Sequence, residues 1–217
     1  NEQLLQERIR LGRPVDIMPF SRHIGYPFQQ INHHTAYFKA FFDYQNIGHF
    51  AFQSTFQQDN RRENRIRRLN HSDIPTVSLH LNSWQNALVW NKGYGQWKSE
   101  AGAQMLVTDN HNERGTGVVP IIPNYTEVAF GLYALQKLTA NRWGLEAGVR
   151  FDGQQTKADG YDWTGRRYGG KRDFTNFTYS IGGHYHINKQ LKVTSHFGVA
   201  WRAPHVYEPV SYTHLRA

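Results

Sequence analysis

The clearest structural signal in the chain comes from residues 143–152, which read Trp143-Gly144-Leu145-Glu146-Ala147-Gly148-Val149-Arg150-Phe151-Asp152. Large apolar or small side chains alternate with glycines and charged residues along the whole stretch. Because successive side chains of a β-strand point to opposite faces of the sheet, one face of this stretch is oily and the other is charged or small. Strands whose outer face contacts lipid and whose inner face contacts a wet lumen have this pattern. The stretch therefore predicts a membrane-spanning β-strand.

The same alternation recurs along the chain and predicts about eight antiparallel strands. They are expected at residues 29–44, 49–59, 75–90, 97–107, 125–138, 143–156, 174–187 and 191–202. Within the third of these, Leu79 and Leu81 fit one phase of the alternation, whereas Trp84 and Leu88 fit the other. A β-bulge near Asn82 would explain the change of phase.

The connections between these strands alternate in length. Short turns are expected at residues 45–48, 91–96, 139–142 and 188–190, and long polar loops at residues 60–73, 109–124 and 157–173. Outer-membrane barrels have this asymmetry, with short periplasmic turns and long extracellular loops. The short turns are also flanked by the aromatic residues Tyr44, Trp90, Tyr94, Trp97 and Trp143, as in an interfacial girdle. Ahead of the strands, residues 2–10 could form one or two helical turns before Pro14.

A soluble β-sandwich or barrel is the alternative fold, because its strands alternate as well. In such a protein the oily faces pack inward and the polar faces contact water. Here the polar faces repeatedly carry small residues, including Gly144, Gly148, Gly182 and Gly198. Small residues fit a crowded lumen better than an open surface, so the pattern favours the all-β, antiparallel transmembrane β-barrel.

The composition sets limits on the function. The mean hydropathy is -0.69 and no stretch approaches the roughly 20 apolar residues of a membrane helix, so any membrane crossing must use strands. The 217 residues include no cysteine and carry a net charge of +8, which attracts anions. The basic residues are spread over loops and lumen-type positions and are not interleaved with stacking aromatics, which argues against a nucleic-acid partner.

Four segments resemble the barrels of TonB-dependent outer-membrane receptors. Residues 197–208 resemble the Arg-Ala-Pro strand of the family and the glutamate that follows it, and residues 144–152 are similar to a second strand of the same barrels. Residues 25–29 and 119–125 agree with two further segments. The four segments occur in the order expected for the family, and the resemblance extends over nearly the whole chain up to Glu208.

The resemblance implies a receptor of Gram-negative outer membranes. It implies a 22-stranded barrel that encloses an N-terminal plug domain and imports a scarce nutrient with energy from the TonB complex, which acts through the plug. The nutrient would be a small molecule or a metal chelate, such as siderophore-bound iron or haem, and no cofactor is expected. Residues 1–208 would then be an internal part of the barrel, with the plug outside this chain. A porin or a barrel enzyme with its site on the rim is the alternative function, although no catalytic motif is present.

The last residues depart from the family pattern. After Glu208 the family would continue with Leu-Tyr or a similar pair, whereas this chain continues as Pro209-Val210-Ser211-Tyr212-Thr213-His214-Leu215-Arg216-Ala217. The segment from Val210 onward reads like a translated sequencing adapter. We therefore expect residues 209–217 to be a non-native tail.

The ligand-binding candidates lie in the three long loops. The loops mix aromatic, amide and guanidinium groups, which bind bulky polar ligands, and the candidates are Arg61, Arg62, His111, Arg114, Tyr161, Trp163 and Arg166. The basic run that contains Arg61 and Arg62 could bind lipopolysaccharide phosphates or an anionic chelate, while a merely solvated loop is the simpler interpretation. His184 and His186 share one strand face, as two ligands of one ion would. Isolated pairs of this kind are common, so no metal site is predicted.

Overall fold

A computed structural model describes residues 2–12, 20, 22–67, 71–162 and 164–206. The described residues form a short helix and eight strands. In chain order these are α1 Glu2–Leu11, β1 Phe28–Tyr44, β2 Gly48–Asn64, β3 Val77–Tyr94, β4 Trp97–Asn112, β5 Asn124–Thr139, β6 Trp143–Tyr161, β7 Arg167–His186 and β8 Lys192–Gly198. The helical turns expected at residues 2–10 are therefore confirmed. No helix in these ranges combines the length and the apolar character needed to cross a membrane.

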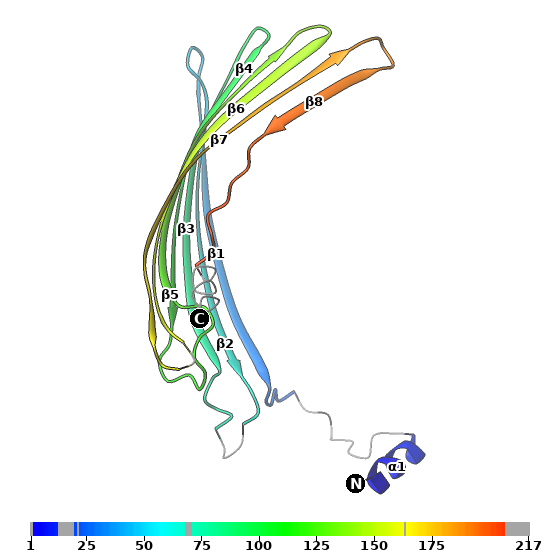
Figure 1. The fold of residues 1–217 in the computed structure, drawn as a ribbon, viewed down its shortest axis with the longest axis vertical. Coiled ribbons are helices and arrows are strands. Elements are labelled where there is room, and N and C mark those ends of the chain that lie inside the picture. Colours follow the sequence, from blue (N-terminus) through cyan, green and yellow to red (C-terminus); the bar gives the residue numbers. More distant parts are fainter. Residues whose placement is uncertain (1, 13–19, 21, 68–70, 163, 207–217) are drawn as a thin grey trace.

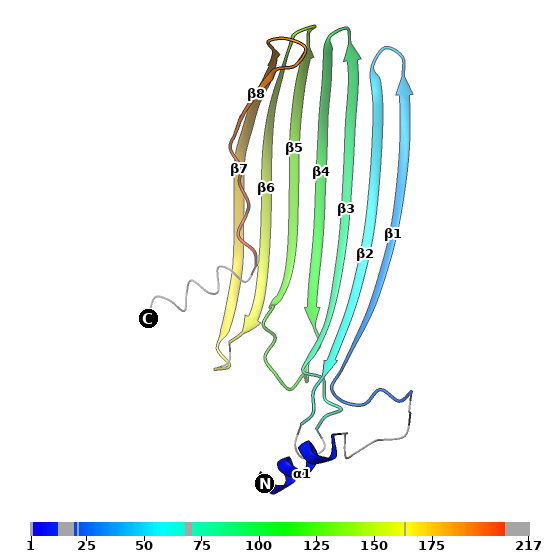
Figure 2. The same ribbon diagram turned by 90° about the vertical axis from the view of Figure 1, so that its right-hand side faces the viewer.

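The eight strands form one antiparallel sheet in which every strand pairs with its neighbours in sequence. Figure 2 shows them side by side, with the short turns gathered at one end and the longer loops at the other. Figure 1 shows that the sheet bends into a curved wall with a concave and a convex side. The predicted all-β, up-and-down arrangement is confirmed. In the described residues the wall is open, with β1 at one edge and β8 at the other.

The strand register joins the apolar faces of separate strands into one continuous surface. Directly paired residues share a face of an antiparallel sheet, and one row of such pairs runs from β2 to β7 through Phe52, Leu88, Ala103, Leu132, Phe151 and Phe177. Leu132 is 53% exposed and Phe177 57% exposed. We call this surface the apolar face. Within the described residues, its large side chains stay exposed.

The opposite surface, which we call the polar face, lines the concave side of the wall. One of its rows contains Gln53, Ala87, Gln104, Gly131, Asp152 and Asn176. Trp201 lines one cavity together with Gln104 and Asp152, and the segment after β8 that carries Trp201 runs along the concave side in Figure 1. The apolar face is therefore convex, as in a barrel whose outer surface contacts lipid.

The described residues contain almost no apolar core. Val206, at 6% exposure, is the only buried hydrophobic residue among them, whereas dozens of large apolar side chains are exposed. Soluble proteins rarely expose contiguous apolar patches larger than a few hundred Å². The arrangement contradicts the soluble sandwich, in which the oily faces would pack against each other.

The apolar face has the height of a membrane. On β5 it extends from Val128 to Leu138, which is roughly 33 Å of strand and, at a tilt of about 40°, roughly 25 Å across a bilayer. At the short-turn end it carries the five predicted girdle residues: Tyr44, Trp90, Tyr94, Trp97 and Trp143. Beyond its other limit the same face becomes polar, as in the row of Gln58, Asn82, Asp109, Thr126, Lys157 and Lys171.

This change of polarity corrects the prediction of a bulge in β3. The pairing of β3 with β2 is uninterrupted, with Gln58 opposite Asn82 and Gln57 opposite Ser83. His80 and Trp84 lie on the same face, although one is polar and the other apolar. The face loses its apolar character where the strand rises above the hydrocarbon zone, and the sequence pattern alone cannot separate this from a change of phase.

The strands are longer at the loop end than predicted. β2 continues to Asn64, β4 continues to Asn112, and only residues 162–166 separate β6 from β7. Backbone pairing does not depend on hydropathy, so polar strand ends remain in the sheet after their alternation has disappeared. In contrast, β8 ends at Gly198, four residues before the predicted end. The last backbone hydrogen bond to β7 is donated by Val199 N to Tyr179 O (3.0 Å), and beyond it the chain leaves the sheet.

Candidate functional site

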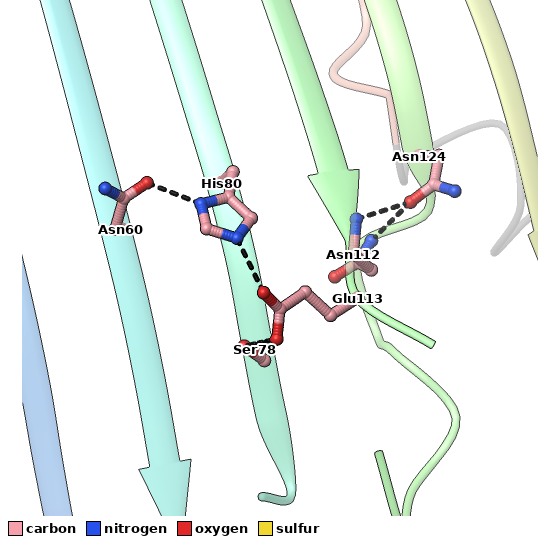
Figure 3. Close-up of polar contacts among 6 residues, drawn as sticks. All are labelled: Asn60, Ser78, His80, Asn112, Glu113 and Asn124. Carbon is pink, nitrogen blue, oxygen red and sulfur yellow. Dashed lines mark hydrogen bonds and ion pairs between the residues drawn. The ribbon is translucent and has the colours of Figure 1, made fainter. Parts of the chain in front are cut away.

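The β4–β5 loop, residues 113–123, is held at its far end by asparagine amides of β4. Asn110 Nδ2 donates to Pro123 O (2.9 Å), and Asn112 Nδ2 donates to Ile122 O (2.9 Å). Asn112 N also donates to Asn124 Oδ1 (2.7 Å), which Figure 3 shows. Asn110 is only 4% exposed. These amides donate hydrogen bonds to loop carbonyl groups that have no partner in a neighbouring strand. The position at which the loop returns to β5 is therefore fixed.

The near end of the loop is fixed by Glu113. Its side chain accepts a hydrogen bond from Ser78 Oγ (2.6 Å) and contacts His80 Nε2 at 2.9 Å. Glu113 N also donates to Ser78 O (2.9 Å). Figure 3 shows the carboxylate between the two β3 side chains. The hydrogen bond with His80, and then the one from Ser78, lower the pKa of the Glu113 carboxyl.

The β6–β7 turn, residues 162–166, is organised by Asp162. Its Oδ1 accepts hydrogen bonds from Thr164 N (2.9 Å), Thr164 Oγ1 (2.6 Å) and Arg166 N (2.9 Å). The Thr164 hydroxyl is the largest cause of a lowered pKa of Asp162. At the base of the turn, Arg167 donates to both oxygens of Asp159, at 2.7 and 2.8 Å. The turn is therefore ordered by its own polar groups.

A cavity of about 740 Å³ lies between these two connections. It is lined by Asn112, Glu113, Arg114, Gly115, Thr116, Gly117, Val118, Val119, Pro120, Pro123, Asn124, Asp159, Gly160, Tyr161 and Gly165. Its volume falls within the range of small-molecule sites, and its lining combines apolar, amide, charged and phenolic groups. We call it the rim pocket.

The rim pocket brings together two of the predicted ligand residues, Arg114 and Tyr161. Arg166 follows the pocket residue Gly165 in the β6–β7 turn, and Trp163 lies outside the described residues. Within the pocket lining, Glu113 is bound by His80 and Ser78 and Asp159 by Arg167. The lining therefore combines the guanidinium of Arg114 with two carboxylates that already have hydrogen-bond partners.

The remaining three candidates lie on strands away from this pocket. Arg61 is on the polar face of β2 and donates to Glu63 Oε1 (2.7 Å), whereas Arg62 is on the opposite face and donates to Asp73 O (3.2 Å). His111 is on β4, opposite His80. Consecutive strand residues point to opposite faces, so Arg61 and Arg62 do not form the joint anion clamp that a flexible loop would allow.

Sequence reasoning missed the parts of the rim pocket contributed by backbone and small residues. Residues 115–120 and Pro123 line it, and Gly117 is contacted by the side chain of Arg67 from the β2–β3 loop. The β4–β5 loop is flanked by Asn110, Asn112 and Asn124. These flanking amides were the sequence signal that could have predicted an ordered loop, because such side chains often hydrogen-bond to nearby backbone groups.

The polar face below the rim carries a separate network of hydrogen bonds. Arg150 binds both oxygens of Asp152 and donates to Gln104 Oε1 (3.3 Å), while Tyr133 Oη donates to Glu100 Oε1 (2.9 Å). Near the short turns, the rings of His184 and His186 lie 5.5 Å apart. No group of three metal-binding side chains occurs within the described ranges. The polar side chains of this network are therefore hydrogen-bonded to one another.

The comparison with known families agrees with this geometry. A family model described as "TonB dependent receptor-like, beta-barrel" matches residues 10–215. The chain belongs to this family. In a TonB-dependent receptor barrel the convex apolar face is the surface toward lipid, and the concave polar face is the surface toward the lumen. No curated protein matches the chain in sequence.

Two solved structures are similar to the chain, and the first of them shows the same fold. The siderophore receptor PiuA from Acinetobacter baumannii matches with a TM-score of 0.52 and 13% sequence identity, covering 76% of this chain and 31% of PiuA. The ferric yersiniabactin uptake receptor FyuA from Yersinia pestis matches with a TM-score of 0.40 and 13% identity, covering 75% of this chain and 27% of FyuA. The chain thus spans about a third of the length of PiuA.

Proposed function

We propose that this chain forms part of the wall of a nutrient receptor in the outer membrane of a Gram-negative bacterium. The complete receptor would import a scarce nutrient, such as siderophore-bound iron, haem or another metal chelate, with energy from the TonB complex acting through a plug domain. The observation that carries the proposal is the membership of the TonB-dependent receptor-like barrel family, together with a convex apolar band of membrane height.

The rim pocket supports a binding role at the loop end of the wall. It lies where the extracellular loops of such a barrel would meet an incoming ligand, and its volume suits a small molecule. We propose that Arg114 and Tyr161 contact the nutrient there, with Arg166 in the adjacent turn, and Trp163 stays a candidate by its residue type alone. The guanidinium would favour an anionic chelate, because charge-assisted hydrogen bonds are about twice as strong as neutral ones.

For Arg62, in contrast to Arg61, the geometry favours lipopolysaccharide as the partner. Arg62 lies on the convex side above the apolar band, in a row with Gln30 and Ser78. The phosphates of outer-leaflet lipid occupy this level, and a guanidinium binds phosphate well. We therefore assign Arg62 to the lipid surface rather than to the rim pocket.

The test is uptake by the complete receptor in a strain that lacks its own copy. Cells would be grown under iron limitation with one iron source at a time, from a panel of ferric siderophores and haem. Arg114→Ala is expected to weaken binding of the supported chelate about ten- to a hundredfold, because a hydrogen bond to a charged group is lost. The control is Arg142→Ala, at the short-turn end.

Two outcomes would overturn the proposal. If uptake persisted in cells without a functional TonB complex, the barrel would be a passive porin. If no single-nutrient limitation depended on the receptor, the import role would be wrong. A rim enzyme would instead convert its substrate at the cell surface without any accumulation inside.

A further inference from the structure

The apolar face is not evenly filled, because a hollow of about 550 Å³ interrupts it near the short turns of β6, β7 and β8. Figure 1 shows the short-turn ends of these strands at the top of the wall. Gly183 lines the hollow, and it pairs with Leu145 on β6 and with Ser195 on β8. The rows on either side carry four large exposed side chains: Ile181 and Phe197 in one row, Tyr185 and Val193 in the other. The small side chains of Gly183 and Ser195 therefore leave a gap between two rows of bulky ones.

The part of the hollow on the apolar face is lined mainly by hydrocarbon. Trp143, Leu145, Tyr185 and Val193 contribute to it, and the Ser195 hydroxyl is the small polar exception. Because the apolar face is the surface toward lipid in this family, the hollow opens to the bilayer. Atoms around an empty space lose van der Waals contacts, and packing of this kind is what drives association within a membrane. The hollow therefore suits an acyl chain, which can follow its shape.

The depth of the hollow identifies the leaflet. Trp143 belongs to the aromatic girdle at the short-turn end, and it pairs directly with Tyr185. Indole and phenol rings lie where the acyl chains of a bilayer meet its headgroups. Short turns are periplasmic in barrels of this kind. A lipid in the hollow would thus come from the periplasmic leaflet, with its headgroup beside the short turns.

The two short turns beside the hollow favour a negatively charged headgroup. Residues 139–142 and 187–191 contain one basic residue each and no acidic residue. In the second turn, Asn188 Oδ1 accepts hydrogen bonds from Gln190 N (2.9 Å) and Leu191 N (2.8 Å), which orders the backbone around Lys189. The Lys189 side chain is exposed and has no acidic partner among the described residues. Its ammonium group is therefore available to a phosphate.

We propose that this hollow binds an anionic phospholipid of the periplasmic leaflet, with one acyl chain over Gly183 and the phosphate beside Lys189. Lipid chains elsewhere on the apolar face have neither a recess nor this charge beside them. A lysine near a headgroup contributes about 1 kcal/mol, which is about a fivefold preference for an anionic lipid. The inference depends on the lipid-facing wall and not on the rim pocket or on import.

The experiment is native mass spectrometry of the complete receptor in detergent, with dioleoyl phosphatidylglycerol or dioleoyl phosphatidylcholine added. The natural protein should retain phosphatidylglycerol at an about fivefold lower concentration than phosphatidylcholine. Lys189→Glu should abolish this preference. Ser195→Leu, which fills the hollow, should lower the retention of both lipids. Gly183 is left unchanged, because a Cβ there would lie 3.1 Å from the backbone oxygen of Gly144.

Each variant has a matched control. Lys98→Glu makes the same change of charge at the same end of the wall but on the polar face, and Thr175→Leu makes a similar change of size on the apolar face away from the hollow. Both controls should retain lipid as the natural protein does, and the heat-dependent gel mobility of every variant would confirm that it folds.

Three results would overturn the inference. The first is equal retention of the two lipids by the natural protein, and the second is a preference that survives in Lys189→Glu or an equal loss in Ser195→Leu and Thr175→Leu. The third is a receptor dimer that holds no lipid and is lost in Ser195→Leu, because the hollow would then be a contact between two copies. Since no nutrient is added, none of these results depends on the uptake assay.

Discussion

At the scale of single residues, glycines let large side chains lie flat along the concave wall. Tyr133 lies over Gly102, Arg150 over Gly131, and His184 over Gly144, each on the neighbouring strand. A Cβ at any of these glycines would meet the overlying side chain, which would then have to project into the lumen. The sequence predicted small residues on this face, and the structure shows what they accommodate.

Gly48, at the start of β2, is a glycine that no other residue should replace without cost. Its φ is 124°, and a Cβ there would lie 2.5 Å from the backbone oxygen of Asn91. Gly48→Ala should therefore destabilise the barrel by about 1–3 kcal/mol. The measurement is the midpoint of thermal unfolding of the complete receptor, followed by its mobility shift on gels. Gly93→Ala, in open space on β3, should leave the midpoint unchanged, and equal effects of the two would contradict the assigned backbone.

Asp162 should make the stability of the β6–β7 turn depend on pH in the acid range. Because hydrogen bonds in the folded protein lower its pKa, the ionised carboxylate stabilises the turn above the ordinary carboxyl pKa of about 4, and this contribution is lost as the pH falls through the lowered pKa. Exchange of the Thr164 and Arg166 amides should therefore accelerate at strongly acid pH. In Asp162→Asn, whose side-chain oxygen can still accept, exchange relative to the intrinsic rate should not respond to acid. A turn that loosens equally in both proteins would rule out this role.

At the scale of elements, each strand crosses zones of different polarity. β3 shows this best, since Trp84 and Leu88 occupy the apolar band while Ser78 and His80 on the same face stand above it. The period-2 alternation identified the strands inside the band. It failed at the loop end, where both faces are polar and only backbone pairing shows that the strand continues. The positions of Arg61, Arg62 and His111 on strands could not be predicted for this reason.

Arginine substitutions on the apolar face should depend on depth. Leu132 lies near the middle of the band and Leu145 near the short-turn end. Leu132→Arg should cost about 2–4 kcal/mol and Leu145→Arg about 0–1 kcal/mol, because charge is least tolerated at the bilayer midplane. Folding into vesicles of the complete receptor would measure both. Glu146→Gln, on the polar face, is the control and should fold normally, whereas similar losses in all three variants would show that the faces are wrongly assigned.

At the scale of the whole molecule, the described chain is a curved wall and not a closed barrel. The fold class, the strand order and the apolar face could be predicted from the sequence, because alternation and loop asymmetry are local properties. The rim pocket could be predicted only in part. Arg114 and Tyr161 were identified by residue type, but their meeting depends on how the β4–β5 loop returns over β5, which Asn110 and Asn112 determine through contacts with loop carbonyls.

The most direct measurement is the accessibility of spin labels at adjacent positions of β6 in the complete receptor, reconstituted in lipid. These 217 residues contain no cysteine. Any cysteine elsewhere in the complete receptor would be replaced by serine, so that labels can be placed singly at Phe151→Cys and at Asp152→Cys. With the apolar face toward lipid, the label at residue 151 should collide with membrane-dissolved oxygen and be protected from a water-soluble nickel chelate, while the label at residue 152 should be shielded from oxygen. High nickel accessibility at residue 151, equal to that of a loop label, would contradict the membrane-spanning wall.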